Sequence, residues 1–155
     1  MTAKQLSVAV LGCALAGVVA LAADDPTMGT WKLNEAKSKI GAGAPKNTTV
    51  VYTAAGDSVK CTVDGVDGTG KPTHHEWTGK FDGKDYPVTG DPNEDMRSYT
   101  RVDERTLSVT QKKGGKVVSS GKIAVAPDGK SRTVTNTLTG ADGKKINSTA
   151  FYDKQ

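Results

Sequence analysis

Two adjacent histidines come closest to a chemical site in this chain, and they lie in the run PTHHEW at positions 72–77. Side chains alternate between the two faces of an extended strand, so His74 and Glu76 share one face and His75 and Trp77 share the other. His74 and Glu76 supply only two metal ligands, and no third ligand is spaced to complete a site. His75 and Trp77 either touch a ligand at the mouth of a barrel or lie half-exposed on a surface strand. The second arrangement is the default expectation.

The remaining polar motifs do not predict catalysis. The sequence has no G-x-S-x-G motif, and no nucleophile lies beside a histidine with an acid to orient it. The acidic pairs Glu94–Asp95 and Asp103–Glu104 are interpreted as solvated turn residues, and the glycine-rich residues 65–70 as a hairpin loop. The acidic run 91–95 lacks the residue order of an EF-hand. We therefore predict no enzyme activity, no metal site and no cofactor.

Length and charge restrict the class of protein further. The 155 residues are enough for one ordinary domain, and 21 Lys and Arg against 17 Asp and Glu give a formal charge of only +4. The densest basic cluster, residues 112–116, has no aromatic residues among its lysines, so nucleic-acid binding is not predicted. Eighteen glycines and a hydrophobic content of 35% exclude a helical bundle and a coiled coil.

The first segment has the pattern of an export signal. One charge, Lys4, precedes an apolar run that ends in small residues at Ala23, and an acidic pair follows at once. We predict a signal peptide over residues 1–23, cleaved after Ala22 or Ala23, and a domain over 24–155 in the periplasm or secreted. An uncleaved membrane anchor and lipidation at Cys13 remain as alternatives; after cleavage, no membrane span is expected.

Removal of this segment would leave Cys61 as the single cysteine, so no intrachain disulfide can form. Cys61 lies on the same face of an extended stretch as Val59 and Val63. We interpret it as a small buried apolar side chain rather than as a reactive thiol.

The rest of the sequence predicts an all-β fold. Short β-prone runs are separated by Asp-Gly and Gly-Gly pairs, which suit the tight turns of hairpins. One short helical turn after Asn34, ending before Gly41, is the exception. Eight to ten strands are expected, at about residues 29–33, 48–55, 58–64, 73–81, 84–89, 97–102, 105–111, 116–126, 130–139 and 144–152.

The short links between these runs predict sequential antiparallel neighbours, and so many strands must close into a barrel or divide into a sandwich. Alternation places small and polar residues among the apolar ones on the inner faces. Two of these faces carry Val117, Ser119, Gly121, Ile123 and Val125, and Arg132, Val134, Asn136 and Leu138. Such a mixture packs less densely than an apolar core, so it favours a barrel with an internal cavity.

The tripeptide Gly29-Thr30-Trp31 in the first expected strand resembles the opening of lipocalins and their calycin relatives. The runs GTWKLNEAKSKI, KFDGKDYPVTGD and QKKGGKVV are also similar to a group of small exported bacterial proteins that are described as lipocalin-like. The resemblance implies an up-and-down β-barrel in which Trp31 closes one end and the interior binds a small apolar molecule. Lys154 stands near the C-terminus where lipocalins have an arginine that stacks on this tryptophan.

The leading hypothesis is therefore an exported, monomeric, lipocalin-like barrel that binds a small apolar or amphipathic molecule without catalysis. The alternative is a structural or protein-interaction module of the cell envelope whose barrel core is filled. Trp31 is expected to be structural. The expected ligand-binding residues are aromatic side chains of the interior or the mouth: Tyr52, Trp77, Phe81, Tyr86 and Tyr99.

Overall fold

The computed structural model describes residues 25–155. The signal segment, the cleavage sites after Ala22 and Ala23, and Cys13 lie outside the described residues. The described chain forms ten strands and one short 3₁₀ helix. In chain order these are β1 Gly29–Leu33, η1 Glu35–Lys37, β2 Lys46–Ala55, β3 Ser58–Val66, β4 Pro72–Gly79, β5 Tyr86–Thr89, β6 Met96–Asp103, β7 Thr106–Lys113, β8 Lys116–Val125, β9 Ser131–Thr139 and β10 Lys145–Lys154.

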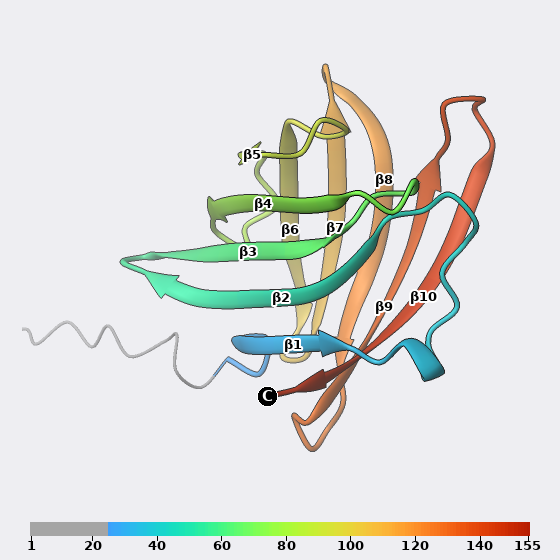
Figure 1. Cartoon of the computed structure of the whole chain (residues 1–155). Coiled ribbons are helices and arrows are strands. Elements are labelled where there is room, and N and C mark those ends of the chain that lie inside the picture. The colour runs from blue at the N-terminus through green and yellow to red at the C-terminus, as the bar shows by residue number, and fades with distance from the viewer. Residues whose placement is uncertain (1–24) are drawn as a thin grey trace, which may run out of the picture.

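All neighbouring strands are antiparallel, and β1 pairs with both β2 and β10, so the meander closes into a ten-stranded barrel. Figure 1 shows β2, β3 and β4 running across the long strands β7 to β10, which curl around the other side. The prediction of an antiparallel barrel is confirmed, and residues 73–89 contain two strands, β4 and β5. No helix of residues 25–155 is long and apolar enough to cross a membrane.

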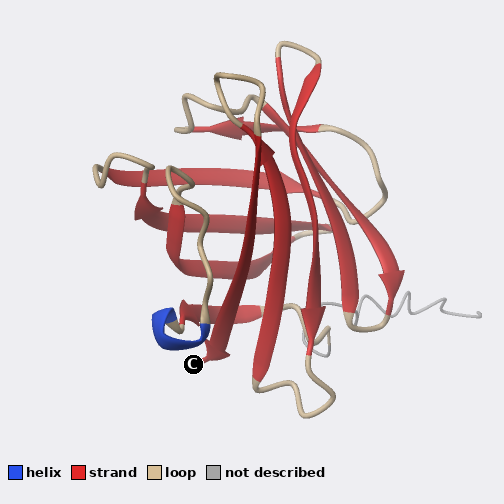
Figure 2. Ribbon diagram, turned by 90° about the vertical axis from the view of Figure 1, so that its right-hand side faces the viewer, coloured by secondary structure: helices blue, strands red, loops and turns tan. Residues whose placement is uncertain are grey.

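The turn residues explain the regular hairpins. At the tip between β7 and β8, Gly114 and Gly115 both have positive φ, at 55° and 77°. Such values are unfavourable for residues with a Cβ atom, whereas glycine adopts them freely and so turns the chain in two residues. The predicted helical turn is also present as η1 (Figure 2). The side chain of Asn34 accepts a hydrogen bond from the backbone N–H of Lys37.

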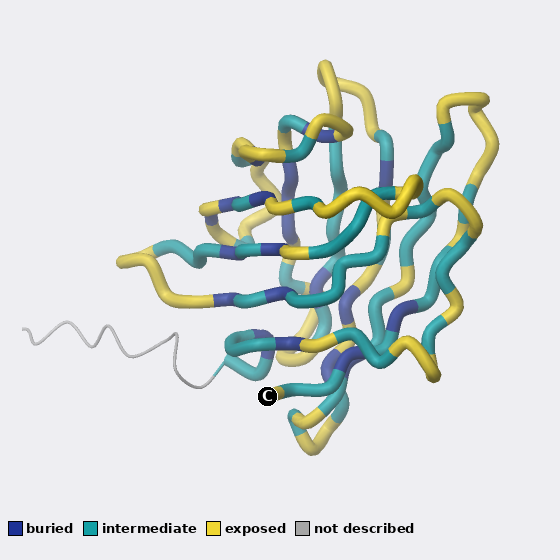
Figure 3. The backbone as a smooth tube through the Cα atoms, viewed as in Figure 1, coloured by how far each residue is buried: buried dark blue, intermediate teal, exposed yellow. Residues whose placement is uncertain are grey.

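The predicted alternation of faces is confirmed on several strands. The placement of Val117 on the inner face of β8 was wrong: it is 54% exposed, because the register between β7 and β8 shifts between Gln111 and Lys112. Cys61 and Val63 on β3 are buried, as are Ser119 and Ile123 on β8. On β9 the inward face is buried at Arg132 and only half-buried at its later residues Val134, Asn136 and Leu138. Figure 3 shows the same change on the long strands, whose ends near the β9–β10 turn are mostly half-buried or exposed. The interior therefore opens toward that end of the barrel.

Trp31 lies at the closure between the first and last strands. It pairs with Val50 of β2 on one side and Lys154 of β10 on the other, and its side chain is fully buried. Its indole N–H donates to the carbonyl of Thr27 over 2.8 Å, so the segment before β1 is attached to the same point. This placement agrees with the structural role expected from the G-x-W motif.

The strand β5 is held in the barrel by few residue pairs. It pairs with β4 through Trp77↔Val88 and its neighbour, and with β6 through Tyr86↔Arg97 and its neighbour. Side chains from both sides of this seam pack tightly inside it. A Cβ atom on Gly79 would lie 2.5–2.6 Å from the rings of Tyr86 and Trp77, so glycine at this position permits their approach.

Candidate functional site

The five aromatic residues predicted to bind a ligand come together in one cluster, although they arise from β2, β4, β5, β6 and the loop before β5. Trp77 is at its centre, with its ring 4.8 Å from Tyr99, 5.8 Å from Tyr86 and 6.3 Å from Phe81. Tyr52 meets Tyr99 edge-on at 6.2 Å. Such offset and edge-to-face pairs stabilise a core beyond the area that they bury.

Tyr52 and Tyr99 of this cluster line a cavity in the barrel interior. Trp77 is 1% exposed and packs against other rings, so the prediction that His75 and Trp77 form a half-exposed surface pair was wrong. Their shared face is the barrel interior. The exposed face of β4 is instead that of His74, which hydrogen-bonds Asp64 over 2.6 Å.

The cavity lies inside the barrel and has a volume of about 70 Å³. Its wall combines aliphatic side chains, amides, tyrosines and two arginines. The lining residues are Asn47, Val50, Tyr52, Val63, Arg97, Tyr99, Val109, Gln111, Ile123, Arg132, Val134, Asn136 and Tyr152. A space of this size encloses several water molecules or a small organic group, but not a whole drug-sized ligand.

Arg132 lies among three rings at the Trp31 end of the cavity. Its guanidinium carbon is 4.7 Å from the centroids of Trp31 and Tyr152 and 5.4 Å from that of Tyr52. The arginine that stacks on the first-strand tryptophan thus comes from β9, while Lys154 also approaches the Trp31 ring, at 5.1 Å. Sequence reasoning placed Arg132 on an inner face but gave it no function.

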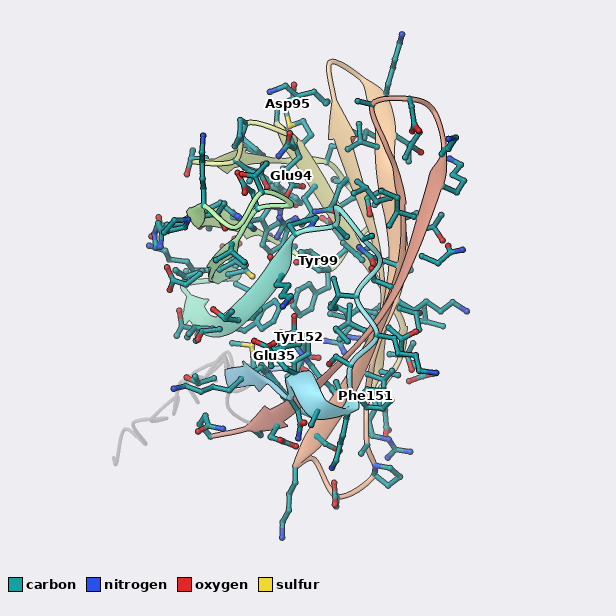
Figure 4. All side chains as sticks on the ribbon, turned by 45° about the vertical axis from the view of Figure 1, so that its right-hand side comes forward. Glu35, Glu94, Asp95, Tyr99, Phe151 and Tyr152 are labelled. Carbon is teal, nitrogen blue, oxygen red and sulfur yellow. The ribbon has the colours of Figure 1, made fainter. Side chains whose placement is uncertain are left out.

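The other end of the cavity has a buried polar network that sequence reasoning missed. Arg97 on β6 forms an ion pair with Glu94, and its Nε donates to Glu94 Oε2 over 3.2 Å. Glu94 also accepts from Gln111 of β7 over 2.9 Å. Figure 4 shows Glu94 at this end of the barrel, beyond Tyr99 and away from Tyr152. Glu94 is 2% exposed, so its interpretation as a solvated turn residue was wrong.

His75 completes this network. Arg97 Nη2 lies 3.1 Å from His75 Nε2, and a guanidinium can only donate, so Nε2 accepts and the ring proton is on Nδ1. Nδ1 in turn lies 3.6 Å from Asp91. Burial, with the charge of Arg97 beside it, lowers the pKa of His75 to about 4, which keeps the imidazole neutral at physiological pH.

His75, Asp91 and Glu94 lie close enough to surround a cation, with ligand atoms within 4.8 Å of one another. However, Arg97 occupies this position, because its guanidinium contacts both His75 and Glu94. A metal ion would have to displace a buried positive charge. The cluster is therefore better described as a structural ion-pair network than as a metal site.

The neutral His75 makes the stability of the barrel depend on pH. The unfolded chain takes up a proton near the usual pKa of 6.5, whereas the folded chain does so only near 4. The unfolded state binds more protons between these values, so the free energy of unfolding should fall as the pH drops from 7 to 4. The full difference corresponds to about 3 kcal/mol.

Urea unfolding of the wild type and of His75→Gln at pH 7 and pH 4.5 measures this effect. The glutamine can still accept from Arg97 but does not titrate, so this variant should lose less stability at pH 4.5. His74→Gln is the matched control: the hydrogen bond to Asp64 raises the pKa of the exposed His74, which adds stability at low pH, so this variant should lose at least as much stability as the wild type. Equal falls for wild type and His75→Gln would contradict the assignment.

Comparisons with known proteins bear on the fold. No protein-family model and no curated protein matches the sequence. Among solved structures, the chain is similar to one described as "Structure of EF1p2_mFAP2b bound to DFHBI", with a TM-score of 0.50 and 12% sequence identity. The similarity covers 84% of this chain and 94% of that chain. The chain shares with that structure a closed antiparallel β-barrel. At this identity the likeness shows the barrel architecture alone.

Proposed function

We propose that this barrel binds a small amphipathic molecule in its interior and is not an enzyme. The observation that carries the proposal is the cavity itself, which lies inside the barrel and is lined by both apolar and polar side chains. The solved barrel similar to this one is bound to DFHBI, which is consistent with small-molecule binding in such a fold.

The wall of the cavity indicates what kind of molecule fits. Val109 and Val134 are partly buried and pack against the core, so they offer apolar surface to a short chain or ring. Asn136 and Gln111 offer amides on the same wall. Since the cavity holds about 70 Å³, the enclosed part of the ligand must be compact, and a longer tail would extend past the half-buried rim.

Filling the cavity should therefore abolish binding. In a methyl-labelled sample titrated with 1-butanol and 1-hexanol, the methyl resonances of Val109, Ile123 and Val134 should shift together. Val109→Phe should weaken this binding by at least about tenfold, because the added ring occupies the space that the ligand needs. Val117→Phe is the matched control, since Val117 lies on β8 with 54% of its surface exposed.

Two results would contradict the proposal. Methyl shifts that are absent throughout the series would favour the alternative function, a structural or interaction module with a filled core. Equal binding by Val109→Phe and Val117→Phe would mean that the ligand lies outside the cavity.

We also propose that the protein is exported to the periplasm or secreted after loss of its first 22 or 23 residues, as a monomer. The support is the basic start, apolar run and small-residue motif of residues 1–23. Intact-mass measurement of the exported protein should give a chain that begins at Ala23 or Asp24. A mass that retains Met1, or that carries a lipid on Cys13, would contradict it.

A further inference from the structure

We propose that the ligand of this cavity is an organic anion, a compact carboxylate whose charged group faces Arg132. The inference rests on the proposed function and adds the chemical class of the ligand. It depends on three features of the interior: an unbalanced buried charge, unpaired donors on that charge, and the small size of the enclosed space.

The charges of the interior do not balance. Arg97 and Arg132 are both almost fully buried, at 4% and 2% exposure, and Glu94 is the only buried carboxylate of residues 25–155. Glu94 is already paired with Arg97. A buried charge without a counter-charge is unfavourable, so the Arg132 end of the cavity is complementary to an anion.

Arg132 also has hydrogen-bond donors without acceptors. Within the described chain, its Nε and Nη1 are buried and have no hydrogen-bond partner. The three surrounding rings stabilise the positive charge, but they supply no lone pair of the kind that an N–H normally meets. A carboxylate oxygen supplies the charged acceptor that either of these N–H groups lacks.

The tyrosines that line the same cavity can add a further donor. The hydroxyls of Tyr52 and Tyr99 lie 3.3 Å apart, and Tyr99 also accepts from Arg97 Nη1 over 3.3 Å. One of the two hydroxyl protons is therefore left over for another acceptor. Burial raises the pKa of Tyr99 to about 12 and that of Tyr52 well above its usual value, so both hydroxyls keep their protons at neutral pH.

The volume limits the enclosed part of the ligand. A cavity of about 70 Å³ is on the order of five water-sized volumes. That space suits a carboxyl group with a short aliphatic portion against Val109, Ile123 and Val134, which line the same cavity. A compact monocarboxylate fits these limits with its charge at Arg132 and its apolar end toward the open side.

The test compares butyrate with butyramide, which has nearly the same shape and no charge. Calorimetric or NMR titration of the wild-type protein should give at least about tenfold tighter binding of butyrate, because hydrogen bonds to a charged group are the stronger kind. Arg132→Met should remove this preference and keep the weak binding of butyramide. Arg132→Lys should keep part of the preference for butyrate. Arg105→Met, at an exposed turn residue, is the control and should leave that preference unchanged.

Equal affinities of the wild type for butyrate and butyramide would overturn the anion proposal while leaving small-molecule binding intact. A preference for butyrate that persists in Arg132→Met would overturn the assignment to Arg132. If neither compound binds and the alcohol series also fails, both this inference and the proposed function are wrong. The wild-type comparison needs no variant, so the proposal stays testable even if Arg132→Met does not fold.

Discussion

Replacing Trp31 with alanine is expected to lower the free energy of unfolding by about 3–5 kcal/mol, the range typical of deleting a large buried aromatic side chain. The indole is fully buried where β1 joins both β2 and β10, so its loss leaves a void at the closure of the barrel. It also removes the donor that meets the carbonyl of Thr27 and one of the three rings around Arg132. Few other positions combine all of these effects.

Thermal unfolding followed by far-UV circular dichroism should show the melting temperature of Trp31→Ala falling by roughly 10–20 °C. Trp31→Phe keeps a ring beside Arg132 but loses the hydrogen bond to Thr27 and part of the buried volume, so its shift should be intermediate. Val102→Ala, at a residue 55% exposed, is the control for a change with little effect. If Trp31→Ala melts within a few degrees of that control, Trp31 does not hold the barrel closed.

A similar loss is expected at Trp77, for a different reason. This side chain is 1% exposed and stacks on Phe81, so it is part of the core rather than of an open mouth. Sequence alternation placed His75 and Trp77 on one face, which is correct. Which side of the sheet that face occupies depends on how β3, β4 and β5 curve around the interior, and a single strand carries no information about this.

The strands were predictable because their signals are local. Every second residue of a strand lies on the same face, so the sequence indicates which face is buried. Ser119 and Ile123 mark this face on β8, and Cys61 and Val63 mark it on β3. Asp-Gly and Gly-Gly pairs mark the ends of the strands because glycine permits the positive φ that the turns require. For the same reason the order of the barrel followed from the sequence, since short turns leave only sequential neighbours.

The polar network was not predictable from local pattern, because its members come from four separate parts of the chain. Glu94 lies in an acidic loop typical of solvent-exposed turns, and its burial depends on Arg97, Gln111 and His75. One sequence signal was available. Arg97 and Tyr99 are two residues apart on β6 and therefore share its inward face. A charged residue on an inward face requires a buried partner of opposite charge.

Glu94→Gln should destabilise the barrel by about 3–5 kcal/mol, although it changes only one atom of the side chain. Both carboxylate oxygens accept hydrogen bonds: Oε1 from Gln111 and Arg97, and Oε2 from Arg97 Nε. In glutamine one of these oxygens becomes an NH₂ group, which would face a donor in either orientation of the amide. The substitution also leaves the charge of Arg97 buried without a counter-charge.

Urea unfolding at pH 7 measures this loss, and a double-mutant cycle separates its origin. In the Arg97→Met background the same Glu94→Gln change should cost much less, because the charge and the N–H donors of Arg97 are gone and only the donor of Gln111 remains. Glu104→Gln, at an exposed turn, is the matched control and should shift stability by no more than about 0.5 kcal/mol. If Glu94→Gln behaves like that control, the buried ion pair does not stabilise this end of the barrel. A large loss that is the same in both backgrounds would instead place the partner of Glu94 at Gln111, since Arg97 would then contribute nothing to the difference.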